Sequence, residues 1–316
     1  MSSVPLSELC VNSFSFFPIT CYAPLMSSPG KSPRASNAVI SSRDNRWLKE
    51  FRVALRGGLP TESGAVGVEG VRLTEEALSS GCRIEAVLFS ESGRRHHARL
   101  APYLDREEIV FPVLYTTDRL FEGVADTEHP QGIAALVEPR KFSFDDILKP
   151  SLSGSAPLVA VLAGVQDPGN VGTILRTAAA FGATAAITSA SGQSGTASPF
   201  SPKALRASAG AALHLPLLAG PALPILLAQL HASKTRTLAT SSHADEAALA
   251  PWDVDWRDPI ALLIGNEGGG LPEEIERSAS ARVRIPMSGG IESLNAAAAA
   301  AVLFYEAARQ RNTLPI

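Results

Sequence analysis

Short apolar runs alternate with amphipathic stretches through the carboxyl-terminal half of the chain. Between two of these runs, Val171, Ile174, Leu175 and Ala178 recur at the spacing of one helix face, and we predict a helix that begins at the N-cap Asn170. Strands that alternate with helices are typical of an α/β fold with a mostly parallel sheet. Residues 158–316 are therefore predicted to form such a domain, with helices on both faces of the sheet. Its strands are expected at residues 158–163, 185–188, 213–218, 237–240, 260–264 and 282–285.

The same alternation runs on a smaller scale through residues 41–138, where the first amphipathic helix is predicted at 44–56. We expect a second, smaller α/β domain there. Residues 139–157 are rich in Pro, Ser, Gly and charge and are predicted as a linker. Residues 1–40 are rich in Ser and Pro without periodicity, which is typical of a disordered arm. The strands of the smaller domain are expected at residues 66–68, 84–90, 108–113 and 132–137.

Two strands of the larger domain run into glycine-rich loops. The strand at 260–264 precedes the loop 265–272, and the strand at 282–285 precedes the loop 286–295. Glycine lets the backbone approach a ligand closely, and ligands of open α/β sheets bind beyond the carboxyl ends of strands. The pattern therefore predicts a small-molecule pocket lined by main chain. The alanine-rich helix that follows, with Val302 and Tyr305 at helical spacing, indicates either tight internal packing or a subunit interface.

Composition and short motifs exclude several classes of protein. The chain has 316 residues, 45% of them hydrophobic, and a formal net charge of -3, so nothing in its bulk charge indicates nucleic-acid binding. Three cysteines without a CxxC spacing argue against a disulfide framework or a zinc site. GxxxxGK[ST], GxGxxG, HExxH and GxSxG are absent. No Lys or Arg precedes Lys31 and no apolar run reaches membrane length, so we expect a cytoplasmic protein.

Three polar loops of the larger domain resemble the motifs of a known family. Asp-Pro-Gly-Asn-Val-Gly at 167–172 with Arg176, Gly-Asn-Glu-Gly at 265–268, and Ile-Pro-Met at 285–287 with Ser-Leu-Asn at 293–295 occur in the family's order. They resemble the motifs of the SpoU family, RNA ribose 2′-O-methyltransferases of the SPOUT class. Residues 68–78 and 127–133 resemble the ribosomal-protein-like α/β domain that precedes many members and binds RNA.

The resemblance carries several expectations. It implies S-adenosyl-L-methionine (SAM) as methyl donor, no metal, a homodimer formed through the larger domain, and a deep trefoil knot there. General packing rules alone would argue against a knot. The fused first domain favours large-subunit ribosomal RNA as substrate. The alternatives are a transfer-RNA ribose methyltransferase, or a non-catalytic RNA-binding or ribosome-assembly factor on the same fold.

The resemblance also assigns five catalytic residues. Arg176 matches the family's catalytic arginine; it either stabilises a developing alkoxide or acts as base, and the alternatives are phosphate binding or a pair with Glu267. Glu267 is expected to orient Arg176 or its own loop. Asn170, Ser293 and Asn295 match the remaining motif positions, with helix capping as the alternative role.

Two further groups of residues complete the predicted site. The donor-binding residues lie at strand ends and in the glycine-rich loops; they are Thr240, Gly265, Asn266, Gly268, Ile285, Met287 and Leu294. The RNA-binding residues are basic side chains of the smaller domain and of the segment after the loop 189–201, for which a solvated charged face is the alternative. These residues are Arg43, Arg46, Arg52, Arg94, Arg95, Lys203 and Arg206.

Overall fold

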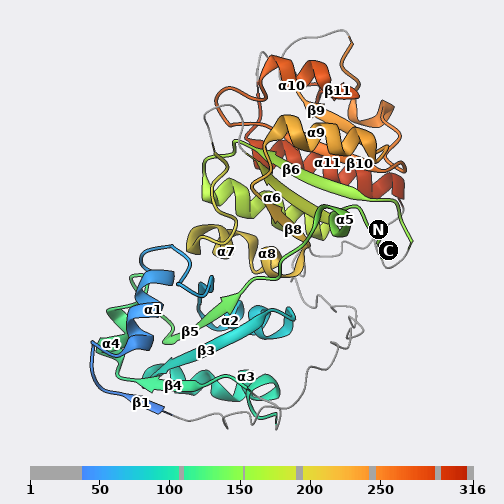
Figure 1. Cartoon of the computed structure of the whole chain (residues 1–316). Helices are drawn as coiled ribbons and strands as arrows, with labels where there is room; N and C mark the ends of the chain where they lie inside the picture. Colours follow the sequence, from blue (N-terminus) through green and yellow to red (C-terminus); the bar gives the residue numbers. More distant parts are fainter. Residues whose placement is uncertain are drawn as a thin grey trace, which may run out of the picture. The chain divides into compact units, whose positions relative to one another are not determined.

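The computed structural model describes residues 38–106, 110–151, 154–189, 195–241, 247–288 and 293–311. These residues form two β-sheets, each packed with helices (Figure 1). Most of the predicted arm, and Gly289 to Glu292 of the third motif loop, lie outside the described residues. The last three residues of the predicted arm, Ala38–Ile40, form strand β1, which pairs with the first sheet. Among the described helices, none is both long and apolar enough to cross a membrane.

The first sheet has five strands in the order β1-β4-β3-β5-β2. Strand β5 is antiparallel to its two neighbours, whereas β4 is parallel to β1 and β3. Of the strand predicted at 108–113, residues 108 and 109 lie outside the described residues and 110–112 form no strand, because β4 begins at Val113, directly after Pro112. Proline has no N–H to donate to a ladder, so it suits the approach to a strand and not its interior. The strand bounds are β2 (Val66–Glu69), β3 (Arg83–Ser90), β4 (Val113–Thr116) and β5 (Ile133–Glu138).

Helices cover both faces of the first sheet. Phe51 of α1 and Phe121 of α4 are buried against one face with Leu88 and Leu136. The opposite face packs against α2 and α3, and a short 3₁₀ turn, η1, leads into α3. The helix bounds are α1 (Arg46–Ala54), α2 (Val71–Ser79), η1 (Ser92–His96), α3 (His97–Leu104) and α4 (Asp118–Glu122).

The second sheet has six described strands in the order β11-β9-β10-β6-β7-β8, and all of their pairings are parallel, where a mostly parallel sheet was predicted. The strand predicted at 213–218 is wrong in its first half. Ala209 and Gly210 adopt positive φ and end one helix, and Leu213 belongs to the short helix that follows. The strand bounds are β6 (Leu158–Ala163), β7 (Ala185–Ser189), β8 (Leu217–Ala219), β9 (Arg236–Thr240), β10 (Ile260–Ile264) and β11 (Ala281–Val283).

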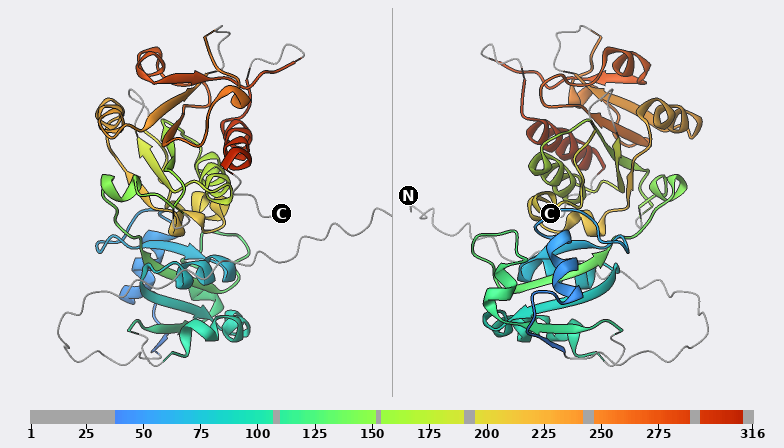
Figure 2. Two further views of the ribbon diagram at one scale, coloured as in Figure 1. Left: turned by 90° about the vertical axis from the view of Figure 1, so that its right-hand side faces the viewer. Right: turned by 60° about the vertical axis from the view of Figure 1, so that its left-hand side comes forward.

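The second sheet is the middle layer of three. Alternate residues of β6 point to opposite faces: Leu158 and Leu162 belong to the core under α6 and α11, and Val159 and Val161 belong to the core under α9 and α10. Figure 2 shows the two pairs of helices on opposite sides of the strands. Burial on both faces explains why β6 and β10 are continuous apolar runs. The helix bounds are α6 (Pro168–Ala180), α9 (Leu223–Ala232), α10 (Glu273–Ser278) and α11 (Ala296–Arg311).

Three shorter helices complete the fold: α5 (Phe144–Ile147), α7 (Pro202–Ser208) and α8 (Ala211–His214). Helix α5 lies inside the predicted linker and buries Ile147 in the second sheet's core. Helix α7 packs tightly on α6 at Gly172, where an added Cβ would lie 2.3 Å from the Ala204 carbonyl oxygen. This contact holds the start of α7 close to the start of α6.

Candidate active site

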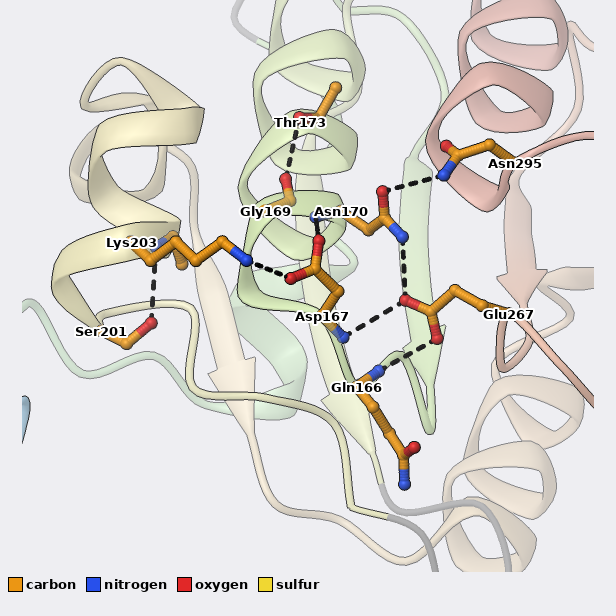
Figure 3. A network of polar contacts seen from close by, with 10 residues as sticks. Gln166, Asp167, Gly169, Asn170, Thr173, Ser201, Lys203, Glu267 and Asn295 are labelled. Carbon is orange, nitrogen blue, oxygen red and sulfur yellow. Dashed lines mark hydrogen bonds and ion pairs between the residues drawn. The ribbon is translucent and has the colours of Figure 1, made fainter.

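Polar loops leave the second sheet at the carboxyl ends of three strands. Strand β6 runs into residues 164–167 and then α6, β10 runs into residues 265–272, and β11 runs into residues 284–295 and then α11. Because the strands are parallel, their carboxyl ends lie at one edge of the sheet. The three motif loops are therefore brought to the same edge, and Figure 3 shows their side chains meeting there.

Asp167 starts helix α6. Its carboxylate accepts a hydrogen bond from the backbone N–H of Asn170 at 3.1 Å and pairs with Nζ of Lys203 on α7 at 2.5 Å. The predicted N-cap, Asn170, is wrong: the helix begins earlier, at Pro168, where the fixed φ of proline suits the first turn. The hydrogen bond from Lys203 is the main reason that the pKa of Asp167 lies below its usual value.

The Asn170 side chain links the other two motifs. Its Nδ2 donates to Glu267 at 3.0 Å, and its Oδ1 accepts from Nδ2 of Asn295 at 3.1 Å (Figure 3). Asn295 also caps α11, since its Oδ1 accepts the backbone N–H groups of Ala297 at 2.9 Å and Ala298 at 3.3 Å. The side-chain amide of Asn170 thus contacts Asn295, which lies 125 positions further along the chain.

Glu267 holds the loop ahead of α6. Its carboxylate accepts the backbone N–H groups of Gln166 at 3.2 Å and Asp167 at 3.3 Å, in addition to the Asn170 amide. Burial alone would raise the pKa of Glu267, but these hydrogen bonds outweigh it and keep the pKa below its ordinary value. Of the two roles expected for Glu267, the structure shows the one in which it orders the loop.

Arg176 does not join this network. It lies six residues beyond Asn170 on α6, which places it about 9 Å along the helix axis and about 120° around it. Its side chain is exposed, and no residue of the described ranges forms an ion pair or hydrogen bond with it. A pair with Glu267, one of the alternatives for Arg176, is therefore wrong within a single chain. Ser293 is exposed beside Asn295.

Several predicted donor-binding residues shape the same edge. Thr240 donates its hydroxyl to the Leu263 carbonyl at 2.9 Å. The Asn266 amide donates to the Gly164 carbonyl at 2.8 Å, while its oxygen accepts from the N–H of Gly268. Both side chains therefore hold backbone in place.

Gly265 is buried where the loop folds back on itself. A Cβ added there would lie 2.3 Å from the carbonyl carbon of Gly270. Of the other predicted donor-binding residues, Ile285 is half-buried against the core, Met287 is half-buried, and Leu294 is exposed. Glycine at 265 is thus required by the loop's own backbone.

Four residues at this edge were assigned no role from the sequence. Gln166 and Asp167 contact Glu267, and Ser241 and Arg284 follow β9 and β11 with buried polar atoms. An Asp followed by Pro at a helix start is a recognised N-cap signal that would have identified Asp167. No sequence signal marks Ser241 or Arg284, because burial of one side-chain atom depends on tertiary packing.

The predicted RNA-binding arginines of the first sheet lie around helix α4. Arg52 of α1 donates to the Gly123 carbonyl at 3.3 Å, at the end of α4. At the start of α4, Asp118 accepts the backbone N–H of Ser92 in η1, which carries Arg94 and Arg95. The two basic patches are therefore neighbours across α4.

Arginines next to aromatic rings also lie in these patches. The Arg94 guanidinium lies 4.5 Å from the Tyr115 ring centre, and that of Arg46 lies 4.7 Å from the Trp47 ring centre. Arg43 is exposed just before α1, and Arg119, which the sequence analysis missed, is exposed on α4 itself. By contrast, Lys203 and Arg206 are already paired, Lys203 with Asp167 and Arg206 with Asp126 at 2.7 Å.

The chain is similar to known protein families and solved structures. Residues 157–305 match the SpoU rRNA methylase family, and residues 61–135 match the MRM3-like substrate-binding domain. A Synechocystis protein named as an uncharacterised tRNA/rRNA methyltransferase is 32% identical over 274 residues, which cover 87% of this chain and 94% of the relative. The Bacillus subtilis 23S rRNA (guanosine(2553)-2′-O)-methyltransferase RlmP is 30% identical, over 84% of this chain and 97% of the relative. A crystal structure of an AdoMet-bound rRNA methyltransferase from Sinorhizobium meliloti superposes with a TM-score of 0.71 at 28% identity, over 88% of this chain and 98% of that one.

Proposed function

The chain belongs to the SpoU rRNA methylase family and is an RNA ribose 2′-O-methyltransferase, and we propose that it methylates large-subunit ribosomal RNA with SAM as donor. The single observation that carries the proposal is the hydrogen-bonded network of Asn170, Glu267 and Asn295. It joins one residue from each of three loops at the carboxyl edge of the sheet. The network holds the three motif loops together at the edge where ligands of open α/β sheets bind.

The residues at this edge fit the proposed donor. Strands β9, β10 and β11 end together, the loop at 265–270 is mostly glycine, and buried polar atoms of Ser241 and Arg284 have no partner in the described parts of the chain. Such groups suit a small ligand that carries polar atoms. When bound, SAM supplies an electrophilic methyl group. Asn266 and Thr240 hold the backbone around that ligand, and Glu267 fixes the neighbouring loop.

Arg176 supplies charge to the reaction. The 2′-hydroxyl is a weak nucleophile, and its oxygen gains negative charge as its proton leaves. Arginine stays protonated, so its guanidinium stabilises that oxygen electrostatically while the proton passes to solvent. Arg176→Ala should lower kcat by about 100- to 1000-fold and leave SAM affinity within about twofold. A variant that methylates at the wild-type rate would remove Arg176 from the mechanism.

The second sheet's exposed helices supply a surface for a dimer. On and before α11, Leu294, Val302 and Tyr305 are 41%, 42% and 49% exposed, and Tyr305 packs edge-on against Phe181 at the end of α6. Exposed apolar residues at helical spacing are typical of an interface between subunits. Val302→Glu should give a monomer in light scattering with little methyl transfer. Val53→Glu, at an equally exposed position on α1, is the matched control and should remain dimeric.

The dimer also explains why Arg176 lies apart from the network. Arg176 is on the exposed side of α6, with Thr173 and Ala180, so a partner docked there would receive its guanidinium. We include in the proposal that Arg176 of one copy serves the Asn170 network of the other. Mixing inactive Arg176→Ala and Asn170→Ala chains should then restore about a quarter of wild-type activity, because half of the dimers are mixed and each has one intact site. Sites built within one chain would show no recovery.

The substrate is tested by methyl transfer from labelled SAM to unmodified total RNA, followed by mass spectrometry of the digested nucleosides. A 2′-O-methyl nucleoside in the large-subunit rRNA fraction is the expected result. Label found only in transfer RNA would show that transfer RNA, and not ribosomal RNA, is the substrate. An absence of both label and SAM binding would indicate a non-catalytic RNA-binding protein.

We propose that the arginines around α4, in the domain of the first sheet, contact RNA. Arg119 is exposed on α4, and the two ends of this helix contact Arg52 and the segment η1 that carries Arg94. Phosphate contacts of this kind position RNA and weaken with salt. Arg119→Ala should therefore weaken RNA binding and reduce its salt dependence, with SAM affinity unchanged. Arg83→Ala, which removes an arginine paired with Glu138 at 3.3 Å, is the control.

The trefoil knot remains part of the proposal. Strand β11 adds outside β9, although β10 separates them in the chain, and α11 then returns to pack on the same face as α6 (Figure 1). This strand order is compatible with the knotted arrangement that the family resemblance implies.

A further inference from the structure

Ser241 and Arg284 follow two neighbouring strands at the same edge of the second sheet. In the parallel ladder of β9 and β11, Thr240 lies opposite Val283. Ser241 follows Thr240 and Arg284 follows Val283, so these two residues are the next pair in register. The backbone N–H of Ser241 donates to the Val283 carbonyl at 3.1 Å, which extends the pairing by one step. Residues in register on adjacent strands present their side chains to the same face. Ser241 and Arg284 are therefore neighbours at the proposed donor site.

Both side chains carry a buried donor that is not satisfied. In the part of the chain that the structure describes, three buried side-chain atoms lack a hydrogen-bond partner: Oγ of Ser241, Nε of Arg284 and Oγ1 of Thr74. Thr74 lies on α2, beside the first sheet, so both of the unpaired atoms next to the second sheet fall at this one position. An unpaired buried polar group costs about 1–3 kcal/mol, and native proteins keep few of them. The pairing of two such donors indicates a ligand group that accepts from both.

We propose that Arg284 and Ser241 bind the carboxylate of the donor's methionine part. This inference rests on the proposed function. A guanidinium has only hydrogen-bond donors and a hydroxyl has one, and a carboxylate has two oxygens that can accept from both groups. The donor's other charged groups, its ammonium and sulfonium, are cations that Arg284 would repel. Ser241 and Arg284 thereby orient SAM by its carboxylate, and the glycine-rich loops contact the rest of the SAM molecule.

The test compares two ligands that differ only in that carboxylate. S-adenosylhomocysteine and its decarboxylated form share the adenosine, the thioether and the amine. Calorimetric titration of the full-length protein should show that Arg284→Met lowers the affinity for S-adenosylhomocysteine by about 10- to 100-fold. The affinity for the decarboxylated ligand should fall by less than about twofold. Arg284→Lys keeps the charge and loses the planar pair of donors, so it should show an intermediate loss. Ser241→Ala should show a smaller loss, again for the carboxylate ligand alone.

Arg277→Met is the matched control, because Arg277 is exposed on α10 and pairs with Glu273 at 3.2 Å. It should bind both ligands as the wild type does. Equal losses for both ligands with Arg284→Met, or no loss for either, would overturn the inference while the methyltransferase assignment stands. A wild-type protein that binds neither ligand would overturn the proposed donor and this inference together.

Discussion

Replacing Glu267 by alanine should destabilise the protein, because one carboxylate holds two loops together. It accepts hydrogen bonds from the Gln166 and Asp167 backbones and from the Asn170 side chain, at 3.2, 3.3 and 3.0 Å. A net hydrogen bond contributes about 0.5–1.5 kcal/mol, and solvent screening around this exposed residue favours the lower end. Glu267→Ala should therefore lower the free energy of unfolding by about 2 kcal/mol. Methyl transfer should fall as well, since the loop that carries Asn170 loses its support.

Glu267→Gln distinguishes the contributions of the three hydrogen bonds. The amide oxygen can take the place of Oε1, which accepts from Asp167 and Asn170, but the amide nitrogen then faces the N–H of Gln166. Two donors cannot bond to one another, so one of the three bonds is lost. We expect Glu267→Gln to cost about 1 kcal/mol, roughly half the effect of alanine.

Urea unfolding at fixed protein concentration measures these differences, since the stability of the proposed dimer would depend on concentration. A double-mutant cycle of Glu267→Ala with Asn170→Ala should give a coupling energy of about 0.5–1.5 kcal/mol. Glu273→Ala is the control: that carboxylate is 82% exposed and should change stability by less than about 0.5 kcal/mol. The reasoning is refuted if Glu267→Ala matches this control and its coupling to Asn170 is zero.

Three further predictions follow from the same geometry. Gly172→Ala should destabilise the protein by about 2 kcal/mol in urea unfolding, because the added methyl would lie 2.3 Å from the Ala204 carbonyl oxygen and separate α6 from α7. Gly265→Ala should weaken S-adenosylhomocysteine binding by more than about tenfold in calorimetry, because its methyl would displace the backbone at Gly270. The difference in free energy of unfolding between wild type and Glu267→Ala should be largest at neutral pH. It should decrease below the ordinary carboxyl pKa of 4.5, as the pH falls through the lowered pKa of Glu267 in the folded protein. A difference that grew in acid would contradict this expectation.

Gly195 and Gly269 provide matched controls for the two glycine substitutions. A Cβ at either position meets no atom of the described residues within 4 Å. Alanine at 195 or 269 should therefore leave the free energy of unfolding close to wild type, and alanine at 195 should also leave ligand binding unchanged. A loss as large as that of Gly172→Ala or Gly265→Ala would show that the effect is conformational and not steric.

The apolar pattern was sufficient to predict most of the second sheet. Residues 158–163 and 260–264 match β6 and β10, since a strand buried on both faces must be apolar throughout. Errors arose where a local feature outweighed the pattern. Positive φ at Ala209 and Gly210 inserted α8 into a predicted strand, and Pro112 delayed the start of β4. The start of α6 was misplaced because both Asp167 and Asn170 are good caps, and only Asp167 precedes the proline.

The sequence by itself determined the alternating α/β order, the apolar strands and the three motif loops, because these depend on residues close together in the chain. Only the tertiary structure decided which side chains meet. It joined Asn170 to Asn295 across 125 positions and left Arg176 outside that network. It also placed Ser241 beside Arg284 with buried donors. Such contacts depend on sheet register and helix packing, which bring together residues whose separation in the chain carries no periodic signal.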